Sequence, residues 1–374
     1  MKNIQPIKII YLVDFLRTIN AGTERQLGHL LTGLPASGFS VHLISFQDSP
    51  FLQNEAHGIF PDVTFHSLGA KPDISKSLPS LFKLYRLLKK YRPDIVQCFF
   101  PASNSIGAIV ARLAGVRAVI SSRRDMGYHL TKKDLALYRC ADLVVSRIIC
   151  NSEAVRERAI QLEGISRSKT MVIYNGIALD GCKREINTDN RTNEITVGIV
   201  ANLNRQVKRI DIFIKAASIV HKRFPDVKFW IIGDGLLRKD LESLGSSLGL
   251  DSSLFFLGRR SDVKDLLNKM TIGVISSDSE GLSNAIMEYM SVGLPVIATN
   301  AGGNPQLVND GVSGFLFSPD NADQLAAMIT KMLSEPEKTA RMGEAGYRIL
   351  EKDFGIGKML NETTMLYITL LHKG

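Results

Sequence analysis

The first half of the chain alternates short runs of branched apolar residues with longer stretches in which apolar residues recur every three or four positions. In residues 24–34, for example, Leu27, Leu30 and Leu31 share one face of a predicted helix. The predicted strands are residues 8–14, 40–46, 94–100, 117–122 and 170–177, and the other predicted helices are 80–92 and 105–115, with a helix leading into a strand over 142–152. This alternation predicts a parallel sheet covered by helices on both faces.

A polar segment, residues 178–194, has no apolar period and separates this pattern from a second one. The alternation resumes with strand 195–200, helix 211–224 and strand 227–235. We therefore predict an α/β protein with two doubly wound parallel-sheet domains, residues 1–178 and 195–353, joined by a linker over 179–194. The last helical stretch, 354–374, follows the strands of the second domain and is expected to pack on the first. Ligands in such folds bind at the C-terminal ends of the strands, which predicts a cleft between the domains.

Length and cysteine content narrow the class of protein. The 374 residues suffice for two domains that each bury a core. The four cysteines show no C-x-x-C spacing, which disfavours a disulfide framework and a cysteine zinc site and favours a reducing compartment. The apolar run that begins at Ile9 stops at Asp14, too short for a secretory leader or a membrane span. We expect a cytoplasmic protein that does not span a membrane.

The net charge of +9 belongs entirely to the first half: residues 1–180 hold 23 Lys and Arg against 14 Asp and Glu, and residues 181–374 hold 23 of each kind. A basic half indicates an anionic partner, either a lipid surface, a phosphorylated lipid carrier or nucleic acid, although a solvated basic surface is equally possible. Helix 80–92 separates leucines from basic residues, which fits peripheral membrane contact but also ordinary packing on a sheet. Nucleic acid is disfavoured because the basic half lacks an aromatic stacking platform.

The most informative segment is residues 276–317. Glu280 lies in a loop after a predicted strand, Ser283 or Asn284 is the expected N-cap of the next helix, and Glu288 falls in its early turns. Free N–H groups at that helix start, with Gly281 allowing close approach, predict a phosphate or diphosphate site. The two carboxylates suit hydrogen bonds from sugar hydroxyls better than contact with a phosphate. The alternative is two surface glutamates beside a helix cap.

The pattern E-G-x-x-x-x-x-x-E that begins at Glu280, followed by A-G-G-N and D-G-x-x-G-F-L, resembles that of the retaining glycosyltransferases of GT-B fold in family four. Counterparts of other motifs of this family occur at residues 21–24, 172–177, 201–211, 231–235 and 255–263. The resemblance implies two Rossmann-like domains facing each other across a cleft. It also implies transfer of a sugar from a nucleotide-diphosphate sugar to a hydroxyl of a cell-surface glycan or its lipid-linked precursor, with retention of configuration.

The resemblance further implies roles for individual residues. Glu280 would bind hydroxyls of the donor sugar, and Glu288 the hydroxyls of the ribose. Lys208 would neutralise the departing diphosphate, where negative charge develops. Many relatives have an arginine where this chain has Asn202, so we expect Arg205 to take that role. The remaining donor-binding residues that the resemblance implies are Gly22, Gly233, Gly258, Arg259, Gly281, Leu282, Ser283 and Asn284.

Neither a metal nor another cofactor is expected. Enzymes of this kind use no bound metal, and the sequence has no D-x-D pattern of the sort that holds one. The electrostatic stabilisation of the diphosphate would then depend more heavily on Lys208.

The acceptor site is predicted in residues 121–134, a basic segment after a predicted strand. Arg123, Arg124 and His129 are the candidates, because arginines suit a phosphate on the acceptor or on its lipid carrier. A mobile charged loop without a ligand is the alternative. The segment 94–100, where relatives often carry histidines, offers no general base here. In such enzymes the departing phosphate is thought to take the proton of the acceptor.

Three other functions remain open at this stage. The missing histidines would permit a catalytically silent nucleotide-sugar-binding subunit, although the presence of Glu280, Glu288 and Lys208 together disfavours it. A nucleotide-sugar epimerase would need acid and base side chains near the sugar, and histidines are scarce in the first-domain segments expected at the cleft. A nicotinamide-dependent dehydrogenase is disfavoured because no complete G-x-G-x-x-G follows a predicted strand.

Overall fold

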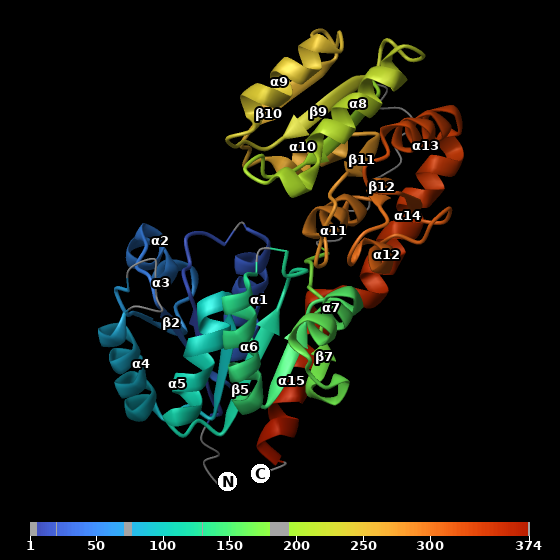
Figure 1. The fold of residues 1–374 in the computed structure, drawn as a ribbon. Helices are drawn as coiled ribbons and strands as arrows, with labels where there is room; N and C mark the ends of the chain where they lie inside the picture. The colour runs from blue at the N-terminus through green and yellow to red at the C-terminus, as the bar shows by residue number, and fades with distance from the viewer. Residues whose placement is uncertain (1–5, 20, 71–76, 129, 180–193, 373–374) are drawn as a thin grey trace. The chain divides into compact units, whose positions relative to one another are not determined.

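The computed structural model describes residues 6–19, 21–70, 77–128, 130–179 and 194–372 (Figure 1). Its contacts divide the chain into two compact units. Unit 1 comprises residues 1–176 and 356–374, and unit 2 comprises residues 177–355. The division thus falls two residues from the boundaries that the sequence indicated, 178 and 353. Most of the expected linker, residues 180–193, lies outside the described residues.

Unit 1 is built on a seven-stranded parallel sheet with the strand order β3-β2-β1-β4-β5-β6-β7. The strands are β1 (Lys8–Val13), β2 (Ser40–Ser45), β3 (Val63–Ser67), β4 (Ile95–Phe99), β5 (Ala118–Arg123), β6 (Arg147–Cys150) and β7 (Thr170–Val172). The direction of winding reverses between β1 and β4. Such a reversal leaves a crevice at the C-terminal ends of the two strands, where ligands bind in open α/β sheets.

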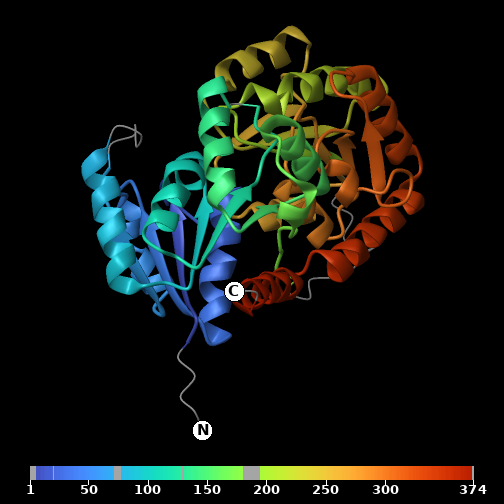
Figure 2. The same ribbon diagram turned by 60° about the horizontal axis from the view of Figure 1, so that its bottom comes forward.

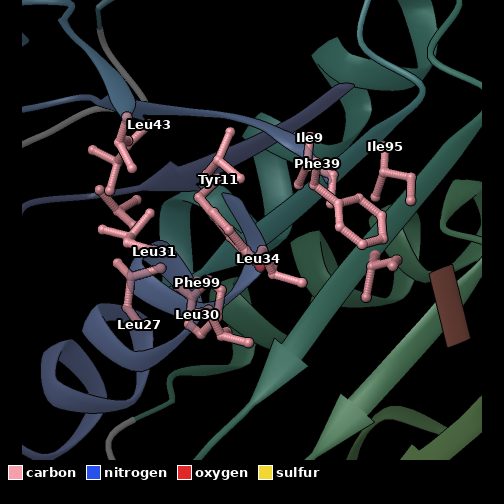
Figure 3. Close-up of a cluster of buried hydrophobic side chains, with 14 of the residues drawn as sticks. Ile9, Tyr11, Leu27, Leu30, Leu31, Leu34, Phe39, Leu43, Ile95 and Phe99 are labelled. Atoms are coloured by element: carbon pink, nitrogen blue, oxygen red, sulfur yellow. The ribbon is translucent and has the colours of Figure 1, made fainter. Parts of the chain in front are cut away.

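Successive side chains of the strands of unit 1 point to opposite faces of the sheet, and each face is covered by an apolar core. Ile9 and Tyr11 of β1 face one core, which Figure 3 shows, and Ile10 and Leu12 face the other. The first core is covered by α1 (Gly22–Ala36), α2 (Pro50–Asn54), α3 (Ala56–Ile59) and α15 (Ile356–His372). The second is covered by α4 (Leu78–Tyr91), α5 (Ala108–Leu113), α6 (Lys132–Val144) and α7 (Glu153–Glu163).

The C-terminal helix α15 packs on unit 1, where it lies beside α1 (Figure 2). Gly33 of α1 leaves room for the side chain of Leu360, since a Cβ there would lie 2.4 Å from a Leu360 methyl carbon. The hydroxyls of Tyr367 and Tyr11 are 2.9 Å apart, and the Tyr367 hydroxyl also donates to the Gln97 side-chain oxygen. These buried polar contacts connect α15 to β1 and β4.

Unit 2 holds a six-stranded parallel sheet in the order β10-β9-β8-β11-β12-β13. Its strands are β8 (Thr196–Val200), β9 (Lys228–Ile232), β10 (Leu254–Gly258), β11 (Ile272–Ile275), β12 (Val296–Thr299) and β13 (Gly314–Phe317). Helices α8 (Ile210–His221), α9 (Arg238–Ser247) and α13 (Ala322–Ser334) share one core with the sheet. The remaining helices are α10 (Val263–Lys269), α11 (Asn284–Ser291), α12 (Asn304–Leu307) and α14 (Pro336–Asp353). The winding reverses between β8 and β11, so a second crevice is expected at their C-terminal ends.

The two ends of unit 2 meet each other. The Ile177 N–H donates to the Phe354 carbonyl over 2.9 Å, and Ile177 forms an isolated β-bridge with Gly355. Unit 2 is therefore inserted into unit 1 between Gly176 and Ile356, with its first and last residues adjacent.

Two doubly wound parallel sheets confirm the predicted α/β class. The periodicity of apolar residues was sufficient for this prediction because every strand except β10 contains at least one buried residue. In the part of the chain that the structure describes, no helix combines the length and apolar character that a membrane crossing requires.

Candidate functional site

The reversal point of the second sheet brings together two residues that lie 72 positions apart in the chain. Lys208 is in the loop after β8, and Glu280 is in the loop after β11. The Lys208 Nζ donates to the Glu280 Oε1 over 2.7 Å, and the side chains are 23% and 12% exposed. The pair joins the strand ends at which the crevice is expected. Both residues were predicted from the sequence, and the structure places them in contact.

The Lys208 loop is attached to the Glu280 loop by further bonds. The Ser276 hydroxyl donates to the Lys208 carbonyl over 2.9 Å, and the Asp278 N–H donates to the Val207 carbonyl over 2.9 Å. The position of the lysine is therefore fixed by the backbone as well as by its own ion pair.

Arg209 also connects the Lys208 loop to the Glu280 loop, and the sequence did not indicate this residue. Its guanidinium group contacts the carboxylates of Asp211, Asp278 and Asp320 at 3.0, 3.1 and 2.5 Å. The hydrogen bonds that Arg209 donates to these carboxylates, first that to Asp211, raise the pKa of Arg209. Its φ of +47° is uncommon for a residue other than glycine. The near neighbour Asp211 was a visible signal, but the contacts with Asp278 and Asp320 depend on the folded loops.

The A-G-G-N motif holds the backbone of Glu280. The Gly303 N–H donates to the Glu280 carbonyl over 3.1 Å. Gly302 has a φ of +54°, and a Cβ there would lie only 1.9 Å from the same carbonyl oxygen. The fully buried Asn304 donates to the Thr299 carbonyl over 3.1 Å, and the Thr299 hydroxyl donates to the Ser277 carbonyl over 2.6 Å. The glycine is thus required for the close approach of two loops.

We expect Gly302→Ala to lower kcat/KM about 100-fold, because a misplacement of about 1 Å in a site has that order of effect. The new Cβ must push the Glu280 backbone aside. Gly311→Ala is the matched control, since Gly311 also has a positive φ, +75°, but a Cβ there meets nothing within 4 Å. Steady-state kinetics and thermal unfolding of both variants separate the effects. Equal kinetic losses in the two variants would contradict the role of Gly302 in placing Glu280.

Helix α11 begins beside Glu280. Ser283 is its N-cap, and the Ser283 hydroxyl accepts a hydrogen bond from the Ile286 N–H over 3.4 Å. Ser283 is therefore the cap, and Asn284 is the first helical residue. The N–H groups of the first turn and the helix dipole favour an anion at this end.

Glu288 and Tyr289 follow one turn later in α11. The Tyr289 hydroxyl accepts from the Val200 N–H over 2.7 Å and so connects the helix to the end of β8. Burial raises the pKa of Tyr289, and the charges of Glu288 and Glu280 add to that effect. Both predicted carboxylates therefore lie near the same tyrosine.

The loops after β9 and β10 lie at the C-terminal ends of the strands, as do the loops of Lys208 and Glu280. The Gly233 N–H donates to the Gly258 carbonyl over 2.9 Å. Gly233 has a φ of +137°, and a Cβ there would lie 1.8 Å from the Ala201 carbonyl oxygen, at the end of β8. Arg259 follows β10 and is exposed. The predicted donor residues of unit 2 thus lie on loops at one edge of one sheet.

Two predicted donor residues have weaker structural support. Arg205 precedes the short 3-10 helix Gln206–Lys208, and its exposed side chain has neither a hydrogen bond nor an ion pair with another described residue. Gly22 is the first residue of α1 in unit 1, and its N-cap Ala21 makes no side-chain capping bond. The approach of Gly22 to the donor phosphates stays a prediction.

The prediction that Arg123 binds an acceptor is wrong. Strand β5 continues to Arg123, whose buried guanidinium group pairs with Glu163 at 2.7 Å and Asp142 at 2.9 Å and lies 4.2 Å from the Tyr138 ring centre. Two carboxylates already neutralise it, so it has no free face for a phosphate. The sequence analysis treated residues 121–134 as one loop, but a strand ends and helix α6 begins within them. His129 lies outside the described residues.

Desolvation raises the pKa of Asp142 above that of an ordinary carboxyl, and the nearby Glu163 raises it further, while Arg123 opposes both effects. The cluster of Arg123, Asp142 and Glu163 is therefore a part of the core of unit 1 and not of a ligand site.

Arg124 is in a different environment from its neighbour. It is half-buried, donates to the Asn175 side-chain oxygen over 2.6 Å and lies 5.4 Å from the Phe99 ring centre. Desolvation lowers the pKa of Arg124 to about 10. No carboxylate among the described residues forms an ion pair with it. Arg124 stays a candidate for an anionic ligand.

Comparison with known proteins relates both halves of the chain to sugar-transferring enzymes. The family described as Glycosyl transferases group 1 matches residues 183–349, and Glycosyltransferase Family 4 matches residues 20–180.

Among curated proteins, UDP-Gal:alpha-D-GlcNAc-diphosphoundecaprenol alpha-1,3-galactosyltransferase of Escherichia coli is 27% identical over 376 residues, covering 95% of this chain and 96% of that protein. The capsular polysaccharide biosynthesis glycosyltransferase CapM of Staphylococcus aureus is 25% identical over 356 residues, covering 90% and 92%.

Among solved structures, Anabaena HepE in complex with UDP and glucose superimposes with a TM-score of 0.84 at 23% identity, covering 97% of this chain and all of that one. This likeness concerns the fold, and it confirms the GT-B class that the motifs predicted.

Proposed function

Because the chain belongs to the glycosyltransferases of group 1 and family 4, we propose that it transfers a sugar from a nucleotide-diphosphate donor to a hydroxyl of a lipid-linked glycan, with retention of configuration. The observation that carries the proposal is the contact of Lys208 with Glu280 beside the start of α11. This corner offers a cation, a carboxylate and the N–H groups at the start of α11, all at the point where the strand order reverses. A sugar joined to a diphosphate needs these three kinds of group.

The charged groups of this corner, which consists of Lys208, Glu280 and the start of α11, suit the departure of a diphosphate. The bond between the sugar C1 and the phosphate oxygen breaks, and a bond from C1 to the acceptor oxygen forms. Lys208 and the N–H groups of α11 stabilise the charge that develops on the phosphate. The departing phosphate oxygen takes the proton of the acceptor hydroxyl, so no separate general base is required.

Glu280 has two tasks in this scheme. Its carboxylate accepts hydrogen bonds from hydroxyls of the donor sugar, and its ion pair holds Lys208 in place before the donor arrives. An ammonium group has three donors, so Lys208 can keep Glu280 and contact a phosphate at the same time. Glu288, one to two turns along α11, is assigned to the ribose hydroxyls of the donor.

The acceptor class rests on the relatives. The Escherichia coli relative acts on a sugar linked to diphosphoundecaprenol, and the Staphylococcus aureus relative takes part in capsular polysaccharide biosynthesis. The charge distribution agrees with a phosphorylated lipid acceptor, because the entire excess of positive charge lies in residues 1–180.

The test is a transfer assay with a panel of radiolabelled nucleotide sugars, a lipid-linked sugar diphosphate acceptor and EDTA, since the proposal includes no metal or cofactor. We expect a labelled lipid product with the anomeric configuration of the donor, as assigned by NMR. A donor that is epimerised and not transferred would favour an epimerase. Tight donor binding with neither transfer nor slow donor hydrolysis would favour a silent subunit.

We also propose that helix α4 makes peripheral contact with the cytosolic face of a membrane. It contains the basic residues Lys83, Arg86, Lys89 and Lys90 and no acidic residue. Leu78 and Phe82, one turn apart, are 74% and 63% exposed. Exposed apolar side chains among basic ones are typical of helices that lie in an anionic membrane interface.

We expect the protein to float with vesicles containing phosphatidylglycerol at low salt and Leu78→Ser/Phe82→Ser to bind them about tenfold less, a loss of about 1.4 kcal/mol. Leu143→Ser is the control, because Leu143 is equally exposed but lies on α6. Recovery of the unsubstituted protein entirely in the soluble fraction would contradict membrane contact, as would an equal loss in the control.

A further inference from the structure

The strand order of unit 1 also reverses, between β1 and β4, and two aromatic rings lie at this point. Phe15 follows β1, Phe100 follows β4, and both are half-buried. Their rings are stacked, with centroids 4.8 Å apart and planes 26° from parallel. The guanidinium group of Arg17 lies 4.8 Å from the centre of the Phe15 ring.

The backbone of Phe100 is held in an uncommon conformation. Its φ is +73°, which is rare for a bulky residue and costs about 1–3 kcal/mol. Successive strand residues normally point to opposite faces of a sheet, yet Phe99 and Phe100 pack against the same core. The strained conformation therefore brings the Phe100 ring to the side of Phe15.

A buried carboxylate stabilises the turn that follows Phe100. The Asp14 side chain accepts from the N–H groups of Ala102 at 2.9 Å and Ser103 at 2.7 Å, and from the Ser103 hydroxyl. The chain then enters the π-helix Ser103–Gly107, a form that is frequent at functional sites. Strain that neighbouring groups maintain in a strand-end crevice points to a function in ligand binding.

Arg124 adds a cation to the same edge of the sheet. It follows β5, the neighbour of β4, and its guanidinium group lies over Phe99, the residue before Phe100. Its hydrogen-bond partner, the Asn175 amide, is neutral. A half-buried cation without a counterion is costly, and an anionic ligand removes that cost. The adjacent Arg123 shows the contrast, since two carboxylates neutralise it.

We propose that at this edge Arg124 binds a phosphate oxygen of an acceptor sugar diphosphate, and that the Phe100 ring of the Phe15–Phe100 stack packs against the apolar face of the attached sugar. The assignment rests on the proposed function, because a sugar diphosphate is the acceptor class named there. Arg17, on the outer face of Phe15, offers a second cation to the diphosphate. Aromatic faces suit the C–H groups of a sugar ring, and arginine suits the paired oxygens of a phosphate.

The test compares two acceptors with the full-length protein: alkyl-diphosphate-linked N-acetylglucosamine and the neutral alkyl glycoside of the same sugar. We expect Arg124→Gln to lower kcat/KM for the diphosphate about 10- to 100-fold, the worth of a hydrogen bond to a charged group. The value for the neutral acceptor and the KM of the donor should stay within about twofold. Arg124→Lys should restore part of the loss. Arg139→Gln is the control, because Arg139 is exposed and, among the described residues, its side chain is hydrogen-bonded only to the Leu162 carbonyl.

Phe15→Leu tests the aromatic stack. It replaces the ring with a smaller apolar side chain, so the loss of stability should be about 1–2 kcal/mol. The KM for both acceptors should rise about tenfold, the worth of one aromatic contact. An unchanged KM would show that the stack is only structural.

Equilibrium binding of the diphosphate acceptor and of UDP, followed by thermal shift, separates the possible sources of the phosphate. Weaker UDP binding by Arg124→Gln with unchanged acceptor binding would assign Arg124 to the donor and overturn the proposal. Failure of the unsubstituted protein to bind the diphosphate acceptor would overturn it as well. Binding that depends on Arg124 without any transfer would support the subsite while contradicting the proposed transfer reaction.

Discussion

Lys208→Ala is expected to lower kcat about 100- to 1,000-fold, the usual effect of removing one preorganised donor from developing charge. The negative charge on the departing diphosphate grows as the bond to the sugar breaks. The lysine therefore stabilises the transition state more than it stabilises the bound ground state. The KM of the donor should therefore change much less than kcat. Initial rates over a range of donor concentrations, with acceptor in excess, measure the two effects separately.

Lys239→Ala is the matched control for this experiment. Lys239 is an exposed lysine of α9 in the same unit, so its loss changes the net charge equally. Lys208→Arg keeps the charge but not the compact ammonium group, and it should recover part of the rate. A Lys208→Ala variant that keeps its full kcat would disprove the role of the Lys208–Glu280 corner in transfer.

The second large effect concerns stability. Arg123→Met should destabilise unit 1 by about 3–5 kcal/mol, because it leaves the buried carboxylates of Asp142 and Glu163 without their cation. Replacing all three residues together, as Arg123→Met/Asp142→Leu/Glu163→Met, should restore most of the loss, since no uncompensated charge is then buried.

Hydrogen exchange of β5 and β6 measures this effect in unit 1. The single tryptophan, Trp230, lies in β9 of unit 2, so its fluorescence gives an independent record of the other unit. Arg167→Met is the control, because Arg167 pairs with Glu153 and Glu157 on the surface and should cost about 1 kcal/mol or less. If the two single variants are equally stable, the buried cluster is not the strong determinant that its burial indicates.

The α/β class could be predicted from the sequence alone, whereas Lys208 and Glu280 were predicted through the family resemblance of their motifs. Each strand is a short apolar run and each helix has a regular period, and these local patterns survive folding. The motif around Glu280 is also local, because its loop, cap and first helical turn are consecutive in the chain.

What the sequence did not indicate depends on contacts between distant residues. Arg123 and Arg124 are adjacent and chemically identical. Because β5 ends at Arg123, the side chain of Arg123 lies in the core and that of Arg124 lies beyond the end of the strand. Arg209 gains two of its three carboxylates from loops about 70 and 110 positions away. The stack of Phe15 on Phe100 requires a positive φ at Phe100, which a phenylalanine does not signal in advance.

The C-terminal helix has a consequence for the order of folding during synthesis. Its residues Met359, Leu366 and Tyr367 complete the core of unit 1, so that core cannot close until α15 has left the ribosome. Unit 2, whose ends are paired with each other, can close earlier. Unit 1 thus closes after unit 2, and a nascent chain stalled before residue 356 should expose apolar surface that chaperones recognise.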